Sequence, residues 1–455
     1  MISTEEAILT SLDDASYDRL LSSLLIKNCE WIVTQNTSRE VVHNASILVQ
    51  DGSISQVGNV NAGNVDKEID GSGKIALPGL VNAHTHLSMT LFRGYADDMR
   101  LQDWLANKIW PLEAKLTDDD CYFGALLGAA EMIRSGTTSF VDMYFHMESV
   151  AKGVAESGLR GFLAYGLIDL FDAEKSRLER ANVQKFYDYV THLGNPRIRF
   201  VIGPHAPYTC SADLLQWTKE FAEKNNTMIH IHVAETRREQ ADSQKQHGMR
   251  VVEYLDEIGA LSKNMLAAHC VWLTKSEVKL LAKSEVKVAH CPVSNMKLAS
   301  GGVAPLPEMF DSGIPVALGT DGAASNNSLD MFETMKICAL IHKAHRWDPS
   351  VLQAQKTLDL ATIEGARALS VDRELGSIET GKRADIILID ANAPNMRPLH
   401  SKETVISDIV YSASSGNVDT TIVDGTVLME HRTLTSLDLP KICAKTQEIA
   451  TKLMT

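Results

Sequence analysis

The sequence predicts an α/β protein: a (β/α)₈ TIM barrel joined to a small β-sandwich domain that both chain ends build. Between about residues 75 and 375, eight short β-branched runs alternate with longer amphipathic segments. Such alternation is typical of βαβ units in a parallel sheet, and eight units over about 240 residues fit a closed barrel. A doubly wound open sheet is the alternative, but no G-x-G-x-x-G follows the first run.

Composition excludes several classes of partner. The chain has 455 residues and a formal charge of −14, with 58 acidic and 44 basic side chains and no block of Lys and Arg. This balance argues against nucleic acid or an anionic membrane as a partner. The seven dispersed cysteines lack a C-x-x-C pair, the N-terminus lacks a signal-peptide pattern, and no apolar stretch reaches the ~18 residues of a membrane span. We therefore expect a cytoplasmic protein.

The two chain ends carry matching strand patterns. A short helix is expected over the first twenty residues, followed by strands with an Asp51-Gly52 turn. Near the C-terminus the pattern returns with an Asp424-Gly425 turn. Neither half is large enough to be stable alone. The sequence therefore predicts one β-sandwich from residues 1–74 and 376–455, the latter ending in a helix, with residues 75–375 as the inserted barrel.

Eight runs supply the barrel strands, in the order IALPGLVNAH, GTTSFVDMY, LRGFLAYGLID, RIRFVIGPHA, NTMIHIHVAE, NMLAAHCVW, VKVAHCPVS and IPVALGTDGA. Active sites in such barrels form at the C-terminal ends of the strands. Six of the runs end in polar side chains suited to catalysis or metal binding: His84, His86, His205, His230, His232, Glu235, His269, His290 and Asp321. We expect these side chains to converge on one site.

A metal centre is the first hypothesis for these strand ends. His84 and His86 are separated by one residue, so they share a face of the strand. Neutral imidazoles suit Zn²⁺ and other first-row ions, and His232 and Asp321 would complete the site. Taken singly, the histidine pair also fits a polar strand-to-loop corner, and Asp321 also fits a helix cap.

The remaining strand-end residues suggest how the site works. Glu235 follows His232 by three residues and suits a general acid/base above the metal, although a loop carboxylate or helix-cap partner is the alternative. His269 would donate to an oxyanion or a bound water, unless it is a hydrogen-bonded core histidine. His230 lies one layer deeper and fits a structural role, and the role of His290 stays open. The fourth run has no Lys to bridge two metals, which favours one ion.

Six motifs carry a family resemblance. PGLVNAHTHL, GTTSFVDM, HVAET, LAAHCVWL, AHCPVSNMKLASG and LGTDGAASNN, in this order, resemble the amidohydrolase superfamily. The nearest branch holds cytosine and guanine deaminases, s-triazine hydrolases and 5-methylthioadenosine/S-adenosylhomocysteine deaminases. The resemblance covers nearly the whole chain, including the GSIETGKRADIILID segment that re-enters the β-domain.

The resemblance implies a set of site residues. One divalent ion per subunit, with Zn²⁺ as the first choice and Fe²⁺ or Mn²⁺ as alternatives, would bind His84, His86, His232 and Asp321. Glu113, in the segment LQDWLANKIWPLEAKL, aligns with a substrate-binding residue of the nucleoside deaminases. His205, in GPHAPYTCS, aligns with another. Glu235 and Asp321 would also contact substrate. Trp104 is a candidate for the pocket wall, and Arg177 is the one candidate for binding a charged substrate tail.

The resemblance also implies a reaction. It is the hydrolytic deamination of 5-methylthioadenosine, S-adenosylhomocysteine, 5′-deoxyadenosine or adenosine to inosine-type products and ammonia. Asp321 would take or orient the proton of the attacking water, Glu235 would protonate a ring nitrogen, and His269 would steady the developing charge. A guanine, cytosine or s-triazine aminohydrolase is the alternative. A non-catalytic binding protein is a more remote one, since all four expected ligands are present. Relatives of this kind form homo-oligomers, here a dimer or tetramer.

Overall fold

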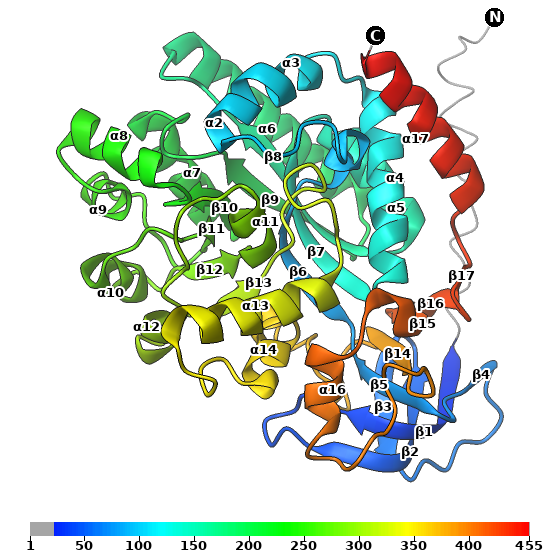
Figure 1. Cartoon of the computed structure of the whole chain (residues 1–455). Helices are drawn as coiled ribbons and strands as arrows, with labels where there is room; N and C mark the ends of the chain where they lie inside the picture. The colour runs from blue at the N-terminus through cyan, green and yellow to red at the C-terminus, as the bar shows by residue number, and fades with distance from the viewer. Residues whose placement is uncertain (1–21, 455) are drawn as a thin grey trace, which may run out of the picture.

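The computed structural model describes residues 22–454, which form a barrel and a separate sheet beneath it (Figure 1). The helix expected over the first twenty residues lies outside the described residues. None of the helices within residues 22–454 combines the length and apolar character that a membrane span requires.

Eight parallel strands make the barrel and confirm the predicted alternation. They pair in the order β13-β12-β11-β10-β9-β8-β7-β6. All residues of β6 and β7 are buried, which is typical of parallel strands covered on both faces. The strands are β6 (Leu80–Thr85), β7 (Thr137–Tyr144), β8 (Arg160–Leu167), β9 (Ile198–Pro204), β10 (Met228–Val233), β11 (Met265–His269), β12 (Lys287–His290) and β13 (Val316–Leu318).

The barrel nearly closes where β13 meets β6. The backbone N–H of Asp321 donates to the carbonyl oxygen of His84 at 2.9 Å. One residue earlier, the N–H of Thr320 donates to Oδ1 of Asn82 at 3.0 Å. These bonds fix the end of the last strand beside the end of the first.

Helices surround the barrel, as the βαβ pattern predicts. Side-chain oxygens of Thr117, Asp172, Ser211, Thr236 and Thr274 accept N–H groups of the first turns and fix where five of the longer helices begin. The outer helices are α4 (Asp118–Arg134), α5 (Met147–Ser157), α6 (Ala173–Leu193), α7 (Ala212–Asn225), α8 (Arg237–His247), α9 (Val251–Glu257), α10 (Lys275–Lys283), α12 (Leu306–Asp311), α13 (Met331–Arg346), α14 (Ala354–Leu360) and α15 (Ile363–Ala368).

Short helices occupy the loops at the carboxyl ends of the strands. They are η1 (Leu87–Phe92), α2 (Leu101–Trp104), η2 (Leu105–Ile109), α3 (Trp110–Glu113) and α11 (Pro292–Lys297). In Figure 1, α2 and α3 lie over one end of the barrel. This segment therefore forms part of the wall of any site there.

Both chain ends build one sheet of nine strands, which confirms the prediction that the two ends share a separate β-domain. Its order is β17-β16-β15-β14-β5-β1-β2-β3, with β4 beside β1. Apolar side chains of both ends, including Ile26, Ile47 and Ile386, form its core. The strands are β1 (Ser23–Val33), β2 (Val41–Gln50), β3 (Ser53–Gly58), β4 (Lys67–Asp70), β5 (Lys74–Pro78), β14 (Ile386–Asp390), β15 (Val418–Val423), β16 (Thr426–Glu430) and β17 (Thr433–Leu434).

Two predicted turns are confirmed in this sheet. Asp51 and Gly52 join β2 to β3 with φ of 47° and 73°, and Asp424 and Gly425 join β15 to β16 with φ of 53° and 75°. Positive φ at both central residues is the backbone of the tight hairpin turn that Asp-Gly favours.

The first predicted barrel run corrects one expectation. IALPGLVNAH is two strands: β5 pairs with β1 and β14 in the end sheet, and only β6 enters the barrel. The chain crosses between them at Gly79, where an added Cβ would lie 2.2 Å from the Thr138 side chain. The change of sheet therefore falls at Gly79 and not at the predicted residue 75.

The end of the chain returns to the barrel. After β17 and the short elements α16 (Val405–Tyr411) and η3 (Ser415–Asn417), helix α17 (Leu439–Met454) runs alongside α4 (Figure 1). Near its end, the Leu453 carbonyl oxygen accepts a hydrogen bond from Nζ of Lys115 at 3.5 Å.

Candidate metal centre and active-site pocket

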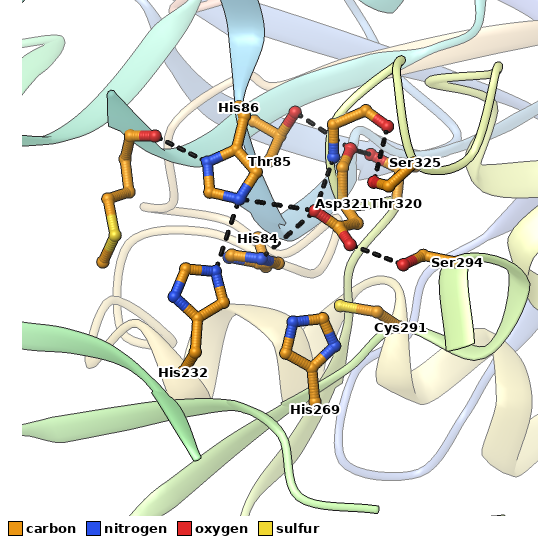
Figure 2. A network of polar contacts seen from close by, with 12 residues as sticks. His84, Thr85, His86, His232, His269, Cys291, Ser294, Thr320, Asp321 and Ser325 are labelled. Carbon is orange, nitrogen blue, oxygen red and sulfur yellow. Dashed lines mark hydrogen bonds and ion pairs between the residues drawn. The ribbon is translucent and has the colours of Figure 1, made fainter. Parts of the chain in front are cut away.

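Three strands bring four predicted ligands together at the carboxyl end of the barrel (Figure 2). Oδ1 of Asp321 lies 3.5 Å from Nε2 of His84 and 3.4 Å from Nε2 of His86. Nε2 of His86 lies 3.3 Å from Nε2 of His232. Two atoms bound to one tetrahedral ion at ~2.05 Å are about 3.3 Å apart. The spacing of these four side chains therefore fits a single metal ion.

Hydrogen bonds to the outer ring nitrogens fix the protons of the three histidines. The carbonyl oxygens of Met143 and His205 accept from Nδ1 of His86 (2.6 Å) and of His232 (2.7 Å). Because a carbonyl oxygen only accepts, Nδ1 carries the proton, and Nε2 keeps a free lone pair turned toward the centre.

His84 also carries its proton on Nδ1, because it donates a hydrogen bond to a second histidine. His230 lies behind it, with Nδ1 3.2 Å from the carbonyl oxygen of Leu266. That contact makes Nδ1 the protonated nitrogen, so Nε2 of His230 accepts from Nδ1 of His84 at 2.7 Å. Nε2 of His84 is buried and has no hydrogen-bond partner. His230 therefore occupies the deeper, hydrogen-bonded position that its place in the strand predicts.

The charges of the four side chains also suit a cation. Burial and neighbouring His84 lower the pKa of His86 to about 4, and burial lowers the pKa of His232 well below its ordinary value. Burial alone would raise the pKa of Asp321, but the adjacent His84 and the other nearby histidines hold it well below its ordinary value. Three neutral imidazoles and one carboxylate form a donor set for a divalent first-row ion.

Two further contacts hold Asp321. Oγ of Ser294 donates to Oδ2 at 2.5 Å (Figure 2), and the N–H of Gly322 donates to Oδ1 at 2.7 Å. Asp321 itself has a φ of 65°. The AHCPVSN motif contains Ser294, but its residue type and spacing alone did not indicate this contact.

His269 differs from the three candidate ligands in the position of its proton. Nδ2 of the Asn295 side chain donates to Nδ1 of His269 at 3.0 Å, which leaves the proton on Nε2. Nε2 lies 3.9 Å from Oε2 of Glu235. Burial lowers the pKa of His269 to about 3, so the ring is neutral and presents an N–H to the site. This geometry suits a hydrogen-bond donor.

Glu235 projects from a sharp turn after β10. The preceding residue, Ala234, has a φ of 54°, and the Glu239 carboxylate accepts the N–H groups of Ala234 (3.0 Å) and Glu235 (2.7 Å). Burial and the nearby Asp321 raise the pKa of Glu235 well above its ordinary value. Sequence reasoning missed Glu239, although its T-x-x-E spacing from Thr236 marked the start of a helix.

A pocket open to solvent lies above the candidate metal centre. Its lining includes His86, His232, Glu235, His269 and Asp321, together with the predicted residues Glu113, His205 and Trp104. Burial raises the pKa of Glu113 to about 7, an effect that the nearby Tyr144 hydroxyl partly opposes. Nδ1 of His205 contacts Oγ1 of Thr209 at 2.8 Å. Tyr144 also lines the pocket, although sequence reasoning did not identify it.

Two other predicted residues lie outside this pocket. Arg177 is exposed on α6, where its side chain pairs with Glu174 at 2.6 Å, and it does not line the cavity. Its assignment to substrate binding is therefore corrected. The surface helix that carries it could not be positioned from sequence. His290 is buried with Nε2 3.2 Å from Nε2 of His342, and it is also absent from the pocket lining.

Known proteins share both the sequence and the fold. A 5′-deoxyadenosine deaminase of Methanobrevibacter smithii is 49% identical over 404 residues, 89% of this chain and 92% of the relative. A 5-methylthioadenosine/S-adenosylhomocysteine deaminase of Thermococcus sibiricus is 48% identical over 407 residues, 90% and 94% of the two chains. A crystal structure of a zinc-bound adenosine deaminase from Xanthomonas campestris has a TM-score of 0.89 and 33% identity, covering 95% and 98%.

The family model agrees with these relatives. The model of the amidohydrolase family matches residues 75–428, which span the barrel and most of the C-terminal part of the end sheet. The chain therefore belongs to the amidohydrolase family.

Proposed function

We propose that the protein is a metal-dependent deaminase that hydrolyses adenosine-type nucleosides to inosine-type products and ammonia. One observation carries the proposal: a single pocket joins the His₃Asp centre, the buried Glu235, and both Glu113 and His205. Relatives at 48–49% identity bear the names of 5′-deoxyadenosine and 5-methylthioadenosine/S-adenosylhomocysteine deaminases, which supports this substrate class.

The candidate ligands are His84, His86, His232 and Asp321, and we propose Zn²⁺ as the ion. The zinc in the adenosine deaminase structure supports this choice, while the donor set also suits Fe²⁺ or Mn²⁺. A divalent ion held there lowers the pKa of water from ~16 towards ~7 and so supplies a nucleophile at neutral pH. Elemental analysis of the purified protein should find about one divalent ion per chain, and two per chain would contradict a single-ion centre.

The proposed proton path uses Glu235, Asp321 and His269. Burial raises the pKa of Glu235 well above its ordinary value, which favours the acid form and suits donation to a ring nitrogen of adenine. Asp321 is ionised and accepts the proton of the attacking water. His269 offers its Nε2–H to the oxygen at C6 as negative charge develops there. Asp321 then passes the water proton to the exocyclic amine, which leaves as ammonia, and the C6 hydroxyl gives its proton to Glu235 as the product carbonyl forms.

Glu113 and His205 are proposed to hold the ribose hydroxyls, and Trp104 to pack against the substrate. A buried carboxylate that binds a hydroxyl discriminates strongly against analogues that lack it. Glu113→Ala should therefore raise KM for nucleosides far more than for free adenine. Equal effects on both would contradict ribose recognition.

A substrate panel tests the proposal as a whole. Adenosine, 5′-deoxyadenosine and 5′-methylthioadenosine should release ammonia, while guanine, cytosine and an aminated s-triazine should not. Turnover confined to the free bases or the triazine would favour the alternative aminohydrolase. No turnover of any compound by the metal-loaded protein would favour the non-catalytic alternative.

We also propose a cytoplasmic homo-oligomer, a dimer or tetramer. All seven cysteines are free thiols, which supports a reducing compartment. Trp347, directly after the end of α13, is 94% exposed, and Leu340 lies exposed on that helix, a pattern that supports a subunit interface. Light scattering of the purified chain measures the assembly, and a monomer would contradict this part of the proposal.

A further inference from the structure

We propose that His290, Cys338 and His342 form a second metal site, which binds a soft monovalent ion of the copper(I) class. The site lies between strand β12 and helix α13, and none of its three residues lines the pocket above the His₃Asp centre. It therefore goes beyond the proposed function and does not depend on it. The grounds are the geometry of the three side chains, their burial and the charges around them.

Two neighbouring elements direct the three side chains to one point. Ala289 packs in an apolar cluster of barrel-strand residues, whereas Val288 belongs to the larger cluster that includes the outer helices. Because side chains alternate along a strand, His290 faces the helices together with Val288. On α13, Cys338 and His342 are four residues apart and therefore lie on the same face of the helix.

The distances between the side chains suit coordination of one ion. Nε2 of His290 lies 3.2 Å from Nε2 of His342. Two nitrogens bound to one ion at ~2.0 Å lie about 3.3–3.5 Å apart in tetrahedral or trigonal geometry. The sulfur of Cys338 and one nitrogen of each ring lie within 4.8 Å of one another. All three residues are at most 2% exposed, as in the closed type of site that holds a structural ion.

A hydrogen bond between the two histidines does not satisfy the pair. Burial lowers the pKa of His290 well below its ordinary value and the pKa of His342 to about 4, so both rings are neutral. Two neutral rings carry two N–H groups, and the contact between the Nε2 atoms uses one. Nδ1 of each ring is buried without a hydrogen-bond partner among the described residues. Buried polar atoms of this kind point to a bound ion or water, and coordination at Nε2 would offset their cost.

Donor type and charge select the ion. Thiolate sulfur is a soft ligand that favours copper(I) or zinc. Two neutral imidazoles and one thiolate carry a single negative charge, so a monovalent ion makes the buried assembly neutral, whereas a divalent ion leaves a positive charge in an apolar interior. Near His342, Arg346 and Glu308 pair with each other at 2.6 Å. Zinc in a closed site also favours four ligands, and the described part of the chain supplies three to this cluster.

Binding exchanges a proton for the ion. Burial raises the pKa of the Cys338 thiol, so the sulfur is protonated before the ion binds. The ion displaces this proton, which passes to solvent, and a sulfur–copper bond replaces the S–H bond. No electron is transferred, and the copper stays monovalent.

The copper content of the full chain tests the site. Wild type is expressed in copper-supplemented medium, so that the ion is available before the site is buried, and is purified without oxygen. Elemental analysis should find about one copper per chain beside the divalent ion of the His₃Asp centre. Cys338→Ser should lower the copper content at least about fivefold. Cys443→Ser, at the exposed cysteine, is the matched control and should leave it unchanged.

The ligands of the copper are measured directly. X-ray absorption at the copper edge of wild type should show one sulfur and two nitrogen neighbours. If Cys338→Ser does not fold, His342→Gln repeats the comparison and should also lower the copper content. Wild type without copper, a copper spectrum without sulfur, a second zinc in place of copper, or an unchanged copper content in a folded variant would each overturn the proposal.

Discussion

The position of a single proton separates the histidines of this site. His86 and His232 donate from Nδ1 to backbone carbonyl oxygens and present bare Nε2 atoms to the centre. His269 accepts at Nδ1 from Asn295 and presents an N–H instead. The same side chain thus suits metal binding in two cases and hydrogen-bond donation in the third, and the neighbouring residues decide which.

Glu235 provides the most direct test at this scale. Glu235→Gln keeps the size of the side chain and removes its exchangeable acid proton. We expect the variant to retain about one divalent ion per chain and to lose turnover by at least ~10²-fold, since general acid/base catalysis contributes on this order. Steady-state kinetics with elemental analysis measures both. A near-normal kcat would remove Glu235 from the proton path.

Glu113 predicts a pH dependence of stability. Burial raises its pKa from the ordinary 4.5 to about 7, so the folded state holds a proton that the unfolded chain releases. Its contribution to stability is complete below about pH 4.5 and is lost as pH rises to about 7. The free energy of unfolding of Glu113→Gln, relative to that of wild type, should therefore rise by about 1–3 kcal/mol as the pH is raised from 5 to 8.

Chemical denaturation at the two pH values measures this difference for the free protein. Glu223→Gln, at an exposed position on α7, is the matched control and should show no comparable change. Equal pH profiles for wild type and Glu113→Gln would show that Glu113 titrates as it does in water.

At the scale of elements, the centre depends on the seam between β6 and β13. Two ligands come from the end of β6, one follows β13, and the backbone bond between Asp321 and His84 spans the seam. Gly319 lies at the closest approach: an added Cβ would be 2.8 Å from Cβ of His84 and 2.9 Å from its backbone nitrogen. The absence of a side chain there lets the two strand ends converge.

Gly319→Ala should separate the two strand ends. We expect a loss of stability of about 1–3 kcal/mol from overpacking and at least tenfold weaker metal binding, measured by thermal melting and chelator competition. Gly63→Ala, where no atom lies within 4 Å of the added Cβ, is the control and should change neither quantity. Unchanged metal affinity in Gly319→Ala would mean that the seam adapts without moving the ligands.

At the scale of the whole molecule, a buried ion pair joins the barrel to the end sheet. Arg160 begins β8, and its guanidinium contacts Asp385 at 3.2 Å and Asp424 at 2.9 Å, with all three side chains at most 5% exposed. Burial alone would raise the pKa of Asp424, but hydrogen bonds and charges from Arg383 and Arg160 hold it below its ordinary value.

Arg160→Met should destabilise the protein by about 3–5 kcal/mol, because it leaves buried carboxylates without their cation. Equilibrium denaturation measures the loss. Arg177→Met removes an Arg whose ion pair is exposed to solvent, and its midpoint should match that of wild type. Equal midpoints for the two variants would show that the buried pair does not hold the two parts together.

Periodicity and turn chemistry made most of the fold predictable. The eight runs, the two Asp-Gly turns and the shared end sheet depend on local patterns, and the structure confirms each. The division of IALPGLVNAH between two sheets was not predictable, because Pro78 and Gly79 mark a turn without indicating which sheet each side joins. The contacts of Ser294, Asn295 and Glu239 likewise depend on neighbours that local patterns do not identify.

The sequence by itself determined which residue types stand at the ends of the strands. Side chains alternate between the two faces of a strand, and all strands of a parallel barrel end on the same side, so few arrangements remain for His84, His86, His232 and Asp321. Only the tertiary structure decided which ring nitrogen of each histidine is free, that Arg177 lies outside the pocket, and that no described Lys or Arg lines it. Proton position and pocket lining depend on distances between side chains far apart along the chain. Those distances arise only when the barrel closes.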